Sequence, residues 1–405
     1  MASQPPTSLK DARSKSTLAI LFGVIIIDLI GVGIVLPILP YYADMFGASG
    51  TVLGLLLATH AAMQFLFSPV WGKLSDRIGR RPVMLITIAG TALSLYLLGM
   101  AQSLAWLFVA RALSGFFSAN ISVAVAYLTD VTDESERTHW MGMIGASFSM
   151  GFILGPALGG LLAPYGLGVP MYTAAGMAAI NFLYAVFALR EPEERAKRKG
   201  LPPKLSAIFK DRVVAQLCLT NFLFTLGVCQ FESMFAYLMK DLFSWDASQV
   251  AWILVMMGLW AAIIQATGLR ALAARFGERA LLATGLLWMA LAYPVVPHSW
   301  SVGLMLVPLV IAAVGRAIAQ SPMISLVSMR AARETRGATM GTFQSAASLA
   351  RVIGPMIAGV LYDASMPFPF YLAGALFVTS FALTLKLKTG ARQSDISTLQ
   401  RTRHF

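Results

Sequence analysis

Apolar runs of about twenty residues recur along the whole of this 405-residue chain. A helix of about twenty apolar residues is long enough to cross the ~30 Å hydrocarbon core of a bilayer. The composition agrees, since 57% of the residues are hydrophobic and 12% are charged, which is more apolar surface than a soluble domain buries. We therefore predict an all-α membrane protein with twelve transmembrane helices. They are expected near residues 17–40, 50–71, 83–101, 105–127, 140–163, 171–189, 213–239, 248–269, 281–297, 301–328, 338–361 and 369–388.

The distribution of charge predicts how this bundle is oriented. Lysine and arginine gather in the N-terminal tail, in alternate loops and at the C-terminus, and such residues stay on the cytoplasmic side of a membrane. Both termini are therefore expected in the cytoplasm. The first apolar run is too long for a cleaved signal peptide and is interpreted as a retained span. The net charge of +12 then indicates cytoplasmic loops and not a nucleic-acid partner.

A polar, strongly charged segment at residues 190–212 divides the chain. We interpret it as a cytoplasmic linker between an N-terminal half, residues 1–189, and a C-terminal half, residues 213–405. Each half would hold six helices.

The two halves also resemble each other in sequence. GPALGG at 155–160 recurs as GPMIAG at 354–359, and LSDRIGRR at 74–81 corresponds to LAARFGER at 272–279, at nearly the same offset. A parallel internal repeat, which is one established transporter architecture, produces this pattern.

Four segments resemble the major facilitator superfamily, and together the likeness covers nearly the whole chain. GKLSDRIGRRP at 72–82 matches its signature loop between the second and third spans. LFVARALSG at 107–115 resembles its fourth-span arginine motif, and GFILGPALGG at 151–160 its fifth-span antiporter motif. The first span, DLIGVGIVLPILP at 28–40, is similar to that of the tetracycline and multidrug proton antiporters. The resemblance implies transport by alternating access between two halves.

The chain departs from the tetracycline exporters at three positions. Where those proteins carry an acid, a histidine and an acid in the third, eighth and ninth spans, ungapped alignment gives Ser94, Ala261 and Met289. Glu232 appears in the seventh span instead. These departures argue against tetracycline as the substrate but leave room for proton coupling through a different acid pair.

Two acids, Asp28 and Glu232, are expected near the middle of the membrane. A charged side chain that faces lipid costs at least ~2.5–3.5 kcal/mol, so intramembrane acids indicate function. Removal from water favours the neutral carboxyl, and such a group can take up and release a proton near neutral pH. The resemblance implies that Arg111 tunes protonation of the first-span acid. Asp28, Glu232 and Arg111 are thus the candidate proton-coupling residues, and a structural ion pair such as Asp28 with Arg111 is the alternative.

Arg316 and Arg351 are further cations expected inside spans. With Arg111 they outnumber the two acids, which hints at an anionic or zwitterionic group on the substrate, although Arg351 could instead bond helix carbonyls. Ordinary packing is the alternative for histidine and aromatic side chains. The candidate substrate-binding residues are His60, Gln64, Asn120, Gln230, Trp260, Arg316, Gln344 and Arg351, with Gln265 and Gln320 as further polar candidates.

The charged 72–82 segment is the candidate gate. Asp76 stands among cations where a span ends, and can accept charge-assisted hydrogen bonds or face a helix N-terminus. The resemblance implies that this helix is the eleventh span, near residues 337–342, so that Asp76 would hold the halves together on the cytoplasmic side. The alternative is a solvated basic loop that sets topology. The candidate gating residues are Gly72, Asp76, Arg77, Gly79, Arg80, Gly155 and Pro156, the last two because small residues and proline allow close packing and bending.

We predict from these features a proton-coupled exporter of a small amphiphilic drug or metabolite. The protein would be a monomer in the inner membrane of a bacterium, with its substrate, protons and the lipid bilayer as partners. The sequence has no P-loop, GxSxG, HExxH or metal-spaced cluster, so neither a cofactor, a metal nor an enzyme activity is expected. The alternatives are a proton-coupled uptake symporter of the same fold and a non-transporting membrane sensor.

Overall fold

The computed structural model describes residues 7–118, 120–131, 134–191, 211–331 and 335–387. Within these ranges the regular structure is entirely helical, which confirms the predicted all-α membrane protein. Eleven helices of the described part are long and apolar enough to cross a membrane, and Met150–Tyr165 is a shorter apolar helix. The expected span at 140–163 falls on this last region, so the count of twelve stays a prediction.

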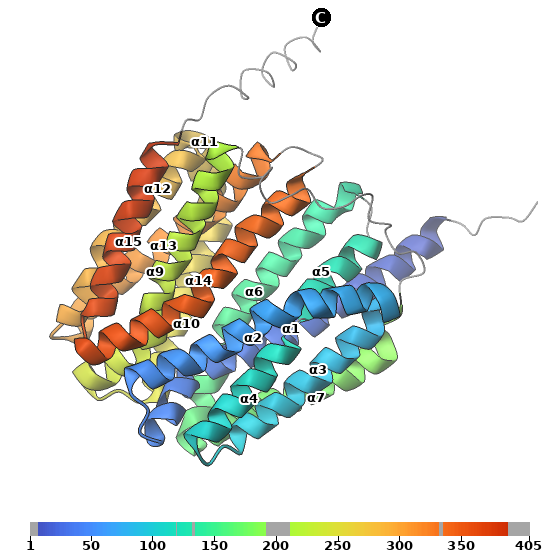
Figure 1. The fold of residues 1–405 in the computed structure, drawn as a ribbon. Coiled ribbons are helices and arrows are strands. Elements are labelled where there is room, and N and C mark those ends of the chain that lie inside the picture. Colours follow the sequence, from blue (N-terminus) through green and yellow to red (C-terminus); the bar gives the residue numbers. More distant parts are fainter. Residues whose placement is uncertain (1–6, 119, 132–133, 192–210, 332–334, 388–405) are drawn as a thin grey trace, which may run out of the picture.

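Two groups of helices lie on either side of residues 192–210 (Figure 1). The first helix group consists of α1 (Thr7–Met45), α2 (Gly50–Ile78), α3 (Arg80–Gly99), α4 (Leu104–Phe117), α5 (Asn120–Val131), α6 (Glu134–Leu162), the 3-10 helix η1 (Ala163–Tyr165) and α7 (Gly168–Ala188). The second helix group consists of α9 (Arg212–Phe243), α10 (Ala247–Thr267), α11 (Leu269–Phe276), α12 (Glu278–Ala292), the 3-10 helix η2 (Tyr293–His298), α13 (Val302–Arg330), α14 (Arg336–Ala364) and α15 (Phe368–Leu385).

Polar residues at helix N-termini explain where several helices begin. The Ser49 side chain accepts from the backbone of Val52 at the start of α2, and Ser301 does the same at the start of α13. Asp246 and Gln249 form a reciprocal capping box at the start of α10. Each of these side chains satisfies a backbone N–H that has no partner inside the helix.

The expected 72–82 loop is almost entirely helical. α2 continues to Ile78 and α3 begins at Arg80, so Gly79 alone makes the turn, with φ +117°. Gly277, between α11 and α12, also has a positive φ, of +79°. Glycine adopts such φ values without the steric cost that other residues incur, which is why the chain can reverse direction over a single residue.

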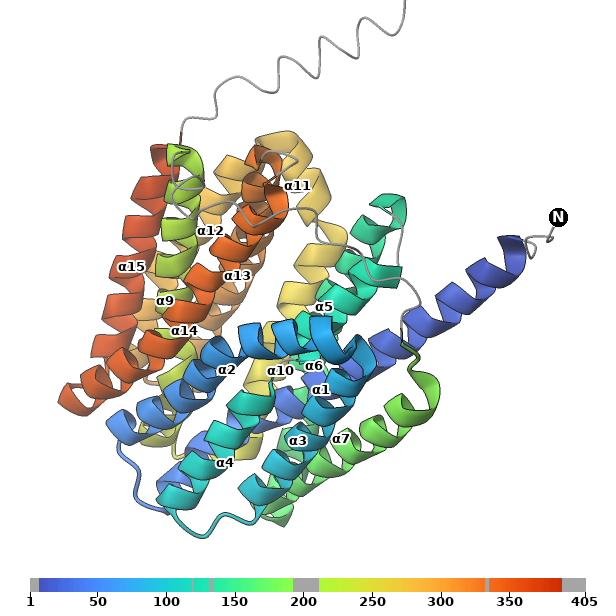
Figure 2. The same ribbon diagram turned by 45° about the vertical axis from the view of Figure 1, so that its right-hand side comes forward.

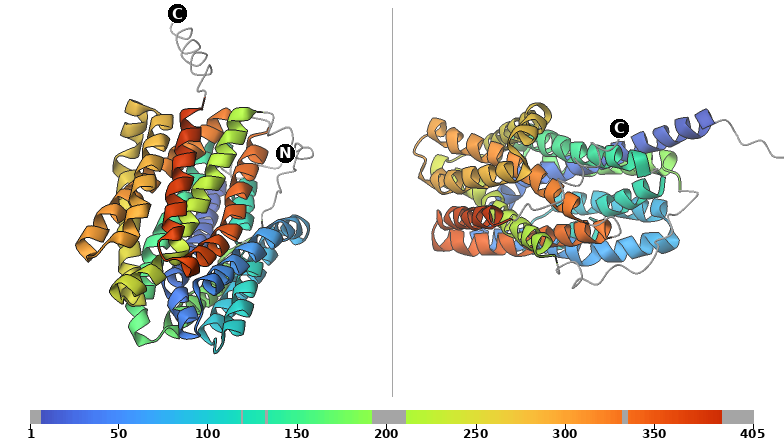
Figure 3. Two further views of the ribbon diagram at one scale, coloured as in Figure 1. Left: turned by 60° about the vertical axis from the view of Figure 1, so that its left-hand side comes forward. Right: turned by 90° about the horizontal axis from the view of Figure 1, so that it is seen from above.

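The same pairs of helices pack in each group. In the first group α1 packs on α6, α2 on α4 and α3 on α7; in the second, α9 packs on α14, α10 on α13 and α12 on α15. Small residues allow close approach, as where Gly33 of α1 meets Gly151 and Gly155 of α6. The groups contact each other mainly through α2 with α14 and α6 with α10 (Figures 2 and 3).

Polar contacts between the two groups gather at one end of the bundle, which we call the Gly50 end. Here the N–H groups of Gly50 and Thr51 donate to the two carboxylate oxygens of Asp363, at 2.7 and 2.8 Å. Lys240 Nζ lies 2.5 Å from Asp44 Oδ2. The Tyr237 hydroxyl donates to the Ala48 carbonyl at 2.9 Å and the Tyr41 hydroxyl to that of Trp245 at 2.9 Å. From this end the two groups diverge (Figures 1 and 2).

Candidate functional site

A cavity with a mixed polar and apolar lining lies within the second helix group, among α9, α13 and α14. We call it the α9–α13–α14 cavity. Its lining residues are Asn221, Phe224, Thr225, Val228, Cys229 and Glu232 from α9, Arg316, Gln320, Met323 and Ile324 from α13, and Phe343, Gln344, Ala347 and Arg351 from α14. Five residues that the sequence singled out therefore share one site: Glu232, Arg316, Gln320, Gln344 and Arg351.

An ion pair joins two of these residues. Arg316 Nη1 lies 2.6 Å from Glu232 Oε1, and the side chains are 33% and 39% exposed. The pair therefore faces the cavity and is not sealed in the core. Charge-assisted hydrogen bonds of this kind are about twice as strong as neutral ones. Glu232, a candidate proton carrier, thus has its charge balanced by Arg316, a candidate substrate-binding residue.

Aromatic packing fixes the segment of α9 that carries Glu232. The Phe231 ring stacks on Tyr293 with centroids 4.7 Å apart and on Phe235 at 4.7 Å. Both phenylalanines are 2% exposed. Because Phe231 is anchored in the core, the next residue, Glu232, is held about 100° further around the helix, where it lines the cavity.

Arg351 brings a second cation to the cavity. Cys229 is within electrostatic reach of Glu232, Arg316 and Arg351, so the three charges lie around one point of α9. Among the described residues, no ion pair or side-chain hydrogen bond is formed by Arg351. With one acid and two arginines, the cavity lining carries a formal charge of +1.

A second set of candidate residues lies in the first helix group. His60 of α2 lies next to Arg111 of α4; His60 is half-buried and Arg111 is buried. His60 Nδ1 and Arg111 Nε have no hydrogen-bond partner among the described residues. Asp28 is half-buried on α1. The predicted influence of Arg111 on Asp28 stays a prediction.

Two glutamines that the sequence suggested for substrate binding form hydrogen bonds to neighbouring helices, and their part in binding stays a prediction. Gln230 is 0% exposed, and its Nε2 donates to the Gly354 carbonyl at 3.0 Å. Gln64 Nε2 donates to the Ser118 carbonyl at 3.2 Å and to its hydroxyl at 3.0 Å. Neither residue lines the α9–α13–α14 cavity. The side chain of Asn120 lies outside the described residues.

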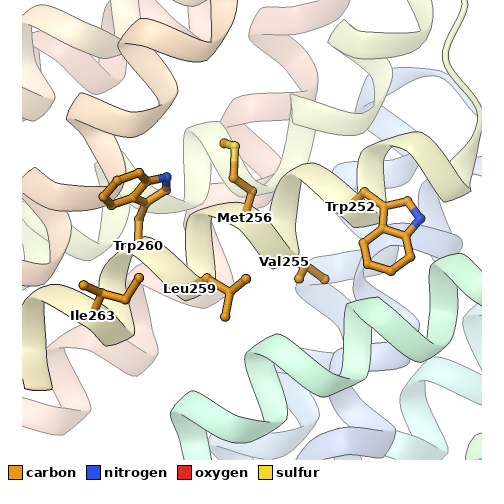
Figure 4. A pocket seen from close by; sticks show the side chains of 6 residues that line it. All are labelled: Trp252, Val255, Met256, Leu259, Trp260 and Ile263. Carbon is orange, nitrogen blue, oxygen red and sulfur yellow. The ribbon is translucent and has the colours of Figure 1, made fainter.

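Trp260 lies in a different pocket from the charged residues. Figure 4 shows this apolar groove, which is formed by α10 alone. Its lining residues are Trp252, Val255, Met256, Leu259, Trp260 and Ile263. The lining has no charged side chain, and the two indole rings are its only hydrogen-bonding groups. The groove therefore suits contact with apolar groups. Trp260 therefore does not join Arg316, Gln344 and Arg351 as the sequence suggested.

The candidate gate forms a network around Arg80. Arg80 Nη1 lies 2.6 Å from Asp76 Oδ1 and 2.6 Å from Ser75 Oγ, and its Nε lies 2.8 Å from Asp130 Oδ2. The Glu191 carboxylate accepts from the backbone N–H groups of Arg80 and Arg81, each at 2.8 Å. The network thus ties α2, α3 and α5 to the end of α7.

Sequence reasoning missed Asp130 and Glu191 as partners of this turn. The sequence offered one clue to these partners. Asp130 stands at the end of the fourth span and Glu191 just after the sixth, on the side of the membrane that carries the 72–82 segment. Arg77 is exposed, and a side chain added at Gly72 would meet open space. The expected contact of Asp76 with residues 337–342 stays a prediction. Gly155 packs against Gly33, and Pro156 lies inside α6.

Many helices that can cross a membrane, with a charged cavity among three of them, are features of secondary membrane transporters. The chain matches the family model described as Major Facilitator Superfamily over residues 21–264 and 217–402. It therefore belongs to this superfamily, whose members transport small molecules and are not enzymes.

Named relatives include bacterial resistance proteins. The chain is 30% identical to the tetracycline resistance protein, class B, of Escherichia coli, over 84% of this chain and 87% of that one. It is 30% identical to multidrug resistance protein 1 of Bacillus subtilis, over 94% and 98%. A similar solved structure is that of the human organic anion transporter MFSD10 (TETRAN), with a TM-score of 0.69, 25% identity, and coverage of 94% and 100%.

Proposed function

We propose that this protein is a proton-coupled exporter of a small amphiphilic compound, and that it works by alternating access. The observation that carries the proposal is the ion pair of Glu232 and Arg316 within a cavity deep in the second helix group. The similarity to tetracycline and multidrug resistance proteins of bacteria supports a drug-like substrate and an inner-membrane location.

The packing supports a two-half architecture. The same three helix pairings occur in both groups, and Gly79 and Gly277, which correspond in the sequence repeat, both have positive φ. These observations support a parallel repeat with halves at 1–189 and 213–405 around the 190–212 linker. Two such halves can rock against each other around a fixed site, as transporters with parallel repeats do.

The contacts between the groups suggest which side is closed. They gather at the Gly50 end, where Asp363 of α14 caps the start of α2. The opposite end carries the basic turn at Gly79, which the positive-inside rule assigns to the cytoplasm together with both termini. We therefore infer a state closed toward the outside and accessible from the cytoplasm, with the Asp76 contact to α14 formed in the opposite state.

Glu232 supplies a physical route to proton coupling. A proton on Glu232 removes the negative charge that holds Arg316, so the ion pair breaks and the packing of α9 against α13 changes. Asp28 of α1 is the second candidate, in the first half, and Arg111 is the residue expected to tune its protonation. In this proposal the proton and the substrate bind in alternation, and the proton gradient drives export.

A proton-coupled uptake symporter of the same fold is the second candidate. It uses the same cavity, but the proton and the substrate would bind together. The direction of proton movement when substrate is added separates the two.

The first test is export of three fluorescent compounds by bacteria that lack their main pumps. Ethidium is a cation, tetracycline a zwitterion, and carboxyfluorescein an anion that cells form from its membrane-permeant diacetate ester. An exporter lowers retention of at least one compound relative to empty vector, and a protonophore abolishes the difference. Equal retention of all three, with the protein present in the membrane, contradicts export of drug-like compounds.

A further inference from the structure

Arg351 is a cation near the middle of α14 with room around it and no protein anion of its own. Arginine stays protonated in proteins, and a charged group at membrane depth is costly unless it is paired, hydrated or functional. Arg316 in the same cavity is engaged by Glu232 at 2.6 Å. The cavity therefore contains one balanced arginine and one whose charge is available to a ligand.

The alternative use of Arg351, bonding to helix carbonyls, finds no support among the described residues. Other arginines of this chain do make such bonds, as Arg81 does to the Val186 carbonyl at 2.6 Å. The side chain of Arg351 forms none within the described ranges and lies on the cavity lining.

Side chains on α14 favour a ligand whose oxygen atoms accept hydrogen bonds. Gln344 lies seven residues before Arg351, which is two helical turns, so both project from one face of α14. Both line the cavity. The guanidinium presents a planar pair of N–H donors that matches a carboxylate, and the glutamine amide adds two further donors.

The lining also has an apolar and aromatic part, beside the polar side chains of Asn221, Thr225 and Gln320. Phe224, Val228, Met323, Ile324 and Phe343 contribute it. A ligand that fills this cavity thus needs an apolar body as well as an anionic end.

We propose that Arg351 binds a carboxylate or similar anionic group of the transported compound, so that the substrate is an acid-bearing amphiphile and not a lipophilic cation. This inference rests on the proposed function of the α9–α13–α14 cavity as the substrate site. Arg316 remains with Glu232 while Arg351, assisted by Gln344, holds the anionic group and the apolar wall holds the body.

The test compares two probes that differ in charge alone, 2-naphthoate and its neutral isostere 2-naphthamide. Their binding to the purified full-length protein is measured by isothermal titration calorimetry. The carboxylate is expected to bind about tenfold more tightly than the amide, as for one charge-assisted interaction. Arg351→Gln should remove this preference and Arg351→Lys should retain part of it.

Arg275→Gln serves as the matched control, because it removes an exposed arginine of α11 outside the cavity. It should leave the preference unchanged. Equal affinity of the two probes for the wild-type protein, no binding of 2-naphthoate, or a preference that survives Arg351→Gln overturns the proposal. Binding and export are measured separately: charge-selective binding without proton-dependent export would leave the anion site at Arg351 standing and remove the proposed export function.

Discussion

Arg316 Nη1 and Glu232 Oε1 are 2.6 Å apart, and this contact joins α13 to α9 inside the α9–α13–α14 cavity. Both side chains are about one-third exposed, so a proton or an ion can reach them from the cavity. The pair is therefore placed to convert a change of charge into a change of helix packing, because it links α9 and α13 inside the cavity.

Removing one partner of the pair should destabilise the protein more than removing both. Arg316→Gln leaves the Glu232 charge without its partner at membrane depth, whereas Glu232→Gln with Arg316→Gln leaves no charge. We expect a coupling energy of about 1 kcal/mol, modest because the pair is partly exposed. Thermal melting of the purified single and double variants measures it, and simple additivity of the two changes would contradict the coupling.

The Asp363 cap should favour the state that is closed at the Gly50 end. Asp363→Ala removes two hydrogen bonds, to Gly50 and Thr51, that join the two helix groups. A helix cap contributes about 1 kcal/mol, so the population of the state open at this end should rise about fivefold.

Spin labels at Met45 and Trp300 report this change, since these residues are 59% and 84% exposed and belong to different groups. The native Cys218 and Cys229 are buried and are replaced by serine. Pulsed electron paramagnetic resonance should show a longer distance component in Asp363→Ala. Asp246→Ala is the control, because it removes a cap within the second group only. An unchanged distance distribution in Asp363→Ala argues against the inter-group cap.

Two glycines of the basic segment should respond in opposite ways to a single methyl group. Gly79 has φ +117°, and a Cβ there would lie 2.8 Å from a carboxylate oxygen of Glu191. Gly79→Ala should therefore cost about 1–2 kcal/mol through backbone strain and displacement of Glu191. Gly72 lies inside α2 with nothing within 4 Å of an added Cβ, so Gly72→Ala should be neutral or slightly stabilising. Equal melting temperatures for the two variants would exclude this account of the turn.

Sequence patterns predicted the helices well because each span carries its own signal. Apolar runs set the helix positions, and α9 begins at Arg212 where residue 213 was expected. The same reasoning predicted a loop at residues 72–82, although the charged residues of this segment are helical up to Ile78. Charge at a membrane surface predicts topology but does not tell a helix from a loop.

The candidate site was predicted less completely, because the sequence alone does not say which face of a helix points into a cavity and which packs against another helix. Glu232 and Gln230 are two residues apart, yet Glu232 lines the cavity while Gln230 braces α14 through Gly354. Trp260 likewise lies in the groove of α10. Partnerships between distant residues, such as Arg80 with Asp130 or Gly50 with Asp363, depend on how helices pack and have no local signal.

The most direct measurement of the central claim is proton movement in energised everted membrane vesicles. Respiration acidifies the lumen, and an antiporter that carries a compound into the lumen lets protons out, which an acid-sensitive fluorescent dye reports. Ethidium, tetracycline and carboxyfluorescein are added in turn to vesicles with the wild-type protein, Glu232→Gln, or Glu278→Gln as an acid outside the cavity.

We predict that at least one compound releases protons with the wild type and with Glu278→Gln, and that Glu232→Gln reduces the release at least about tenfold, since it lacks the group that binds the proton. Proton movement that is the same in Glu232→Gln and the wild type, or absent for all three compounds, would contradict proton exchange through the Glu232–Arg316 pair.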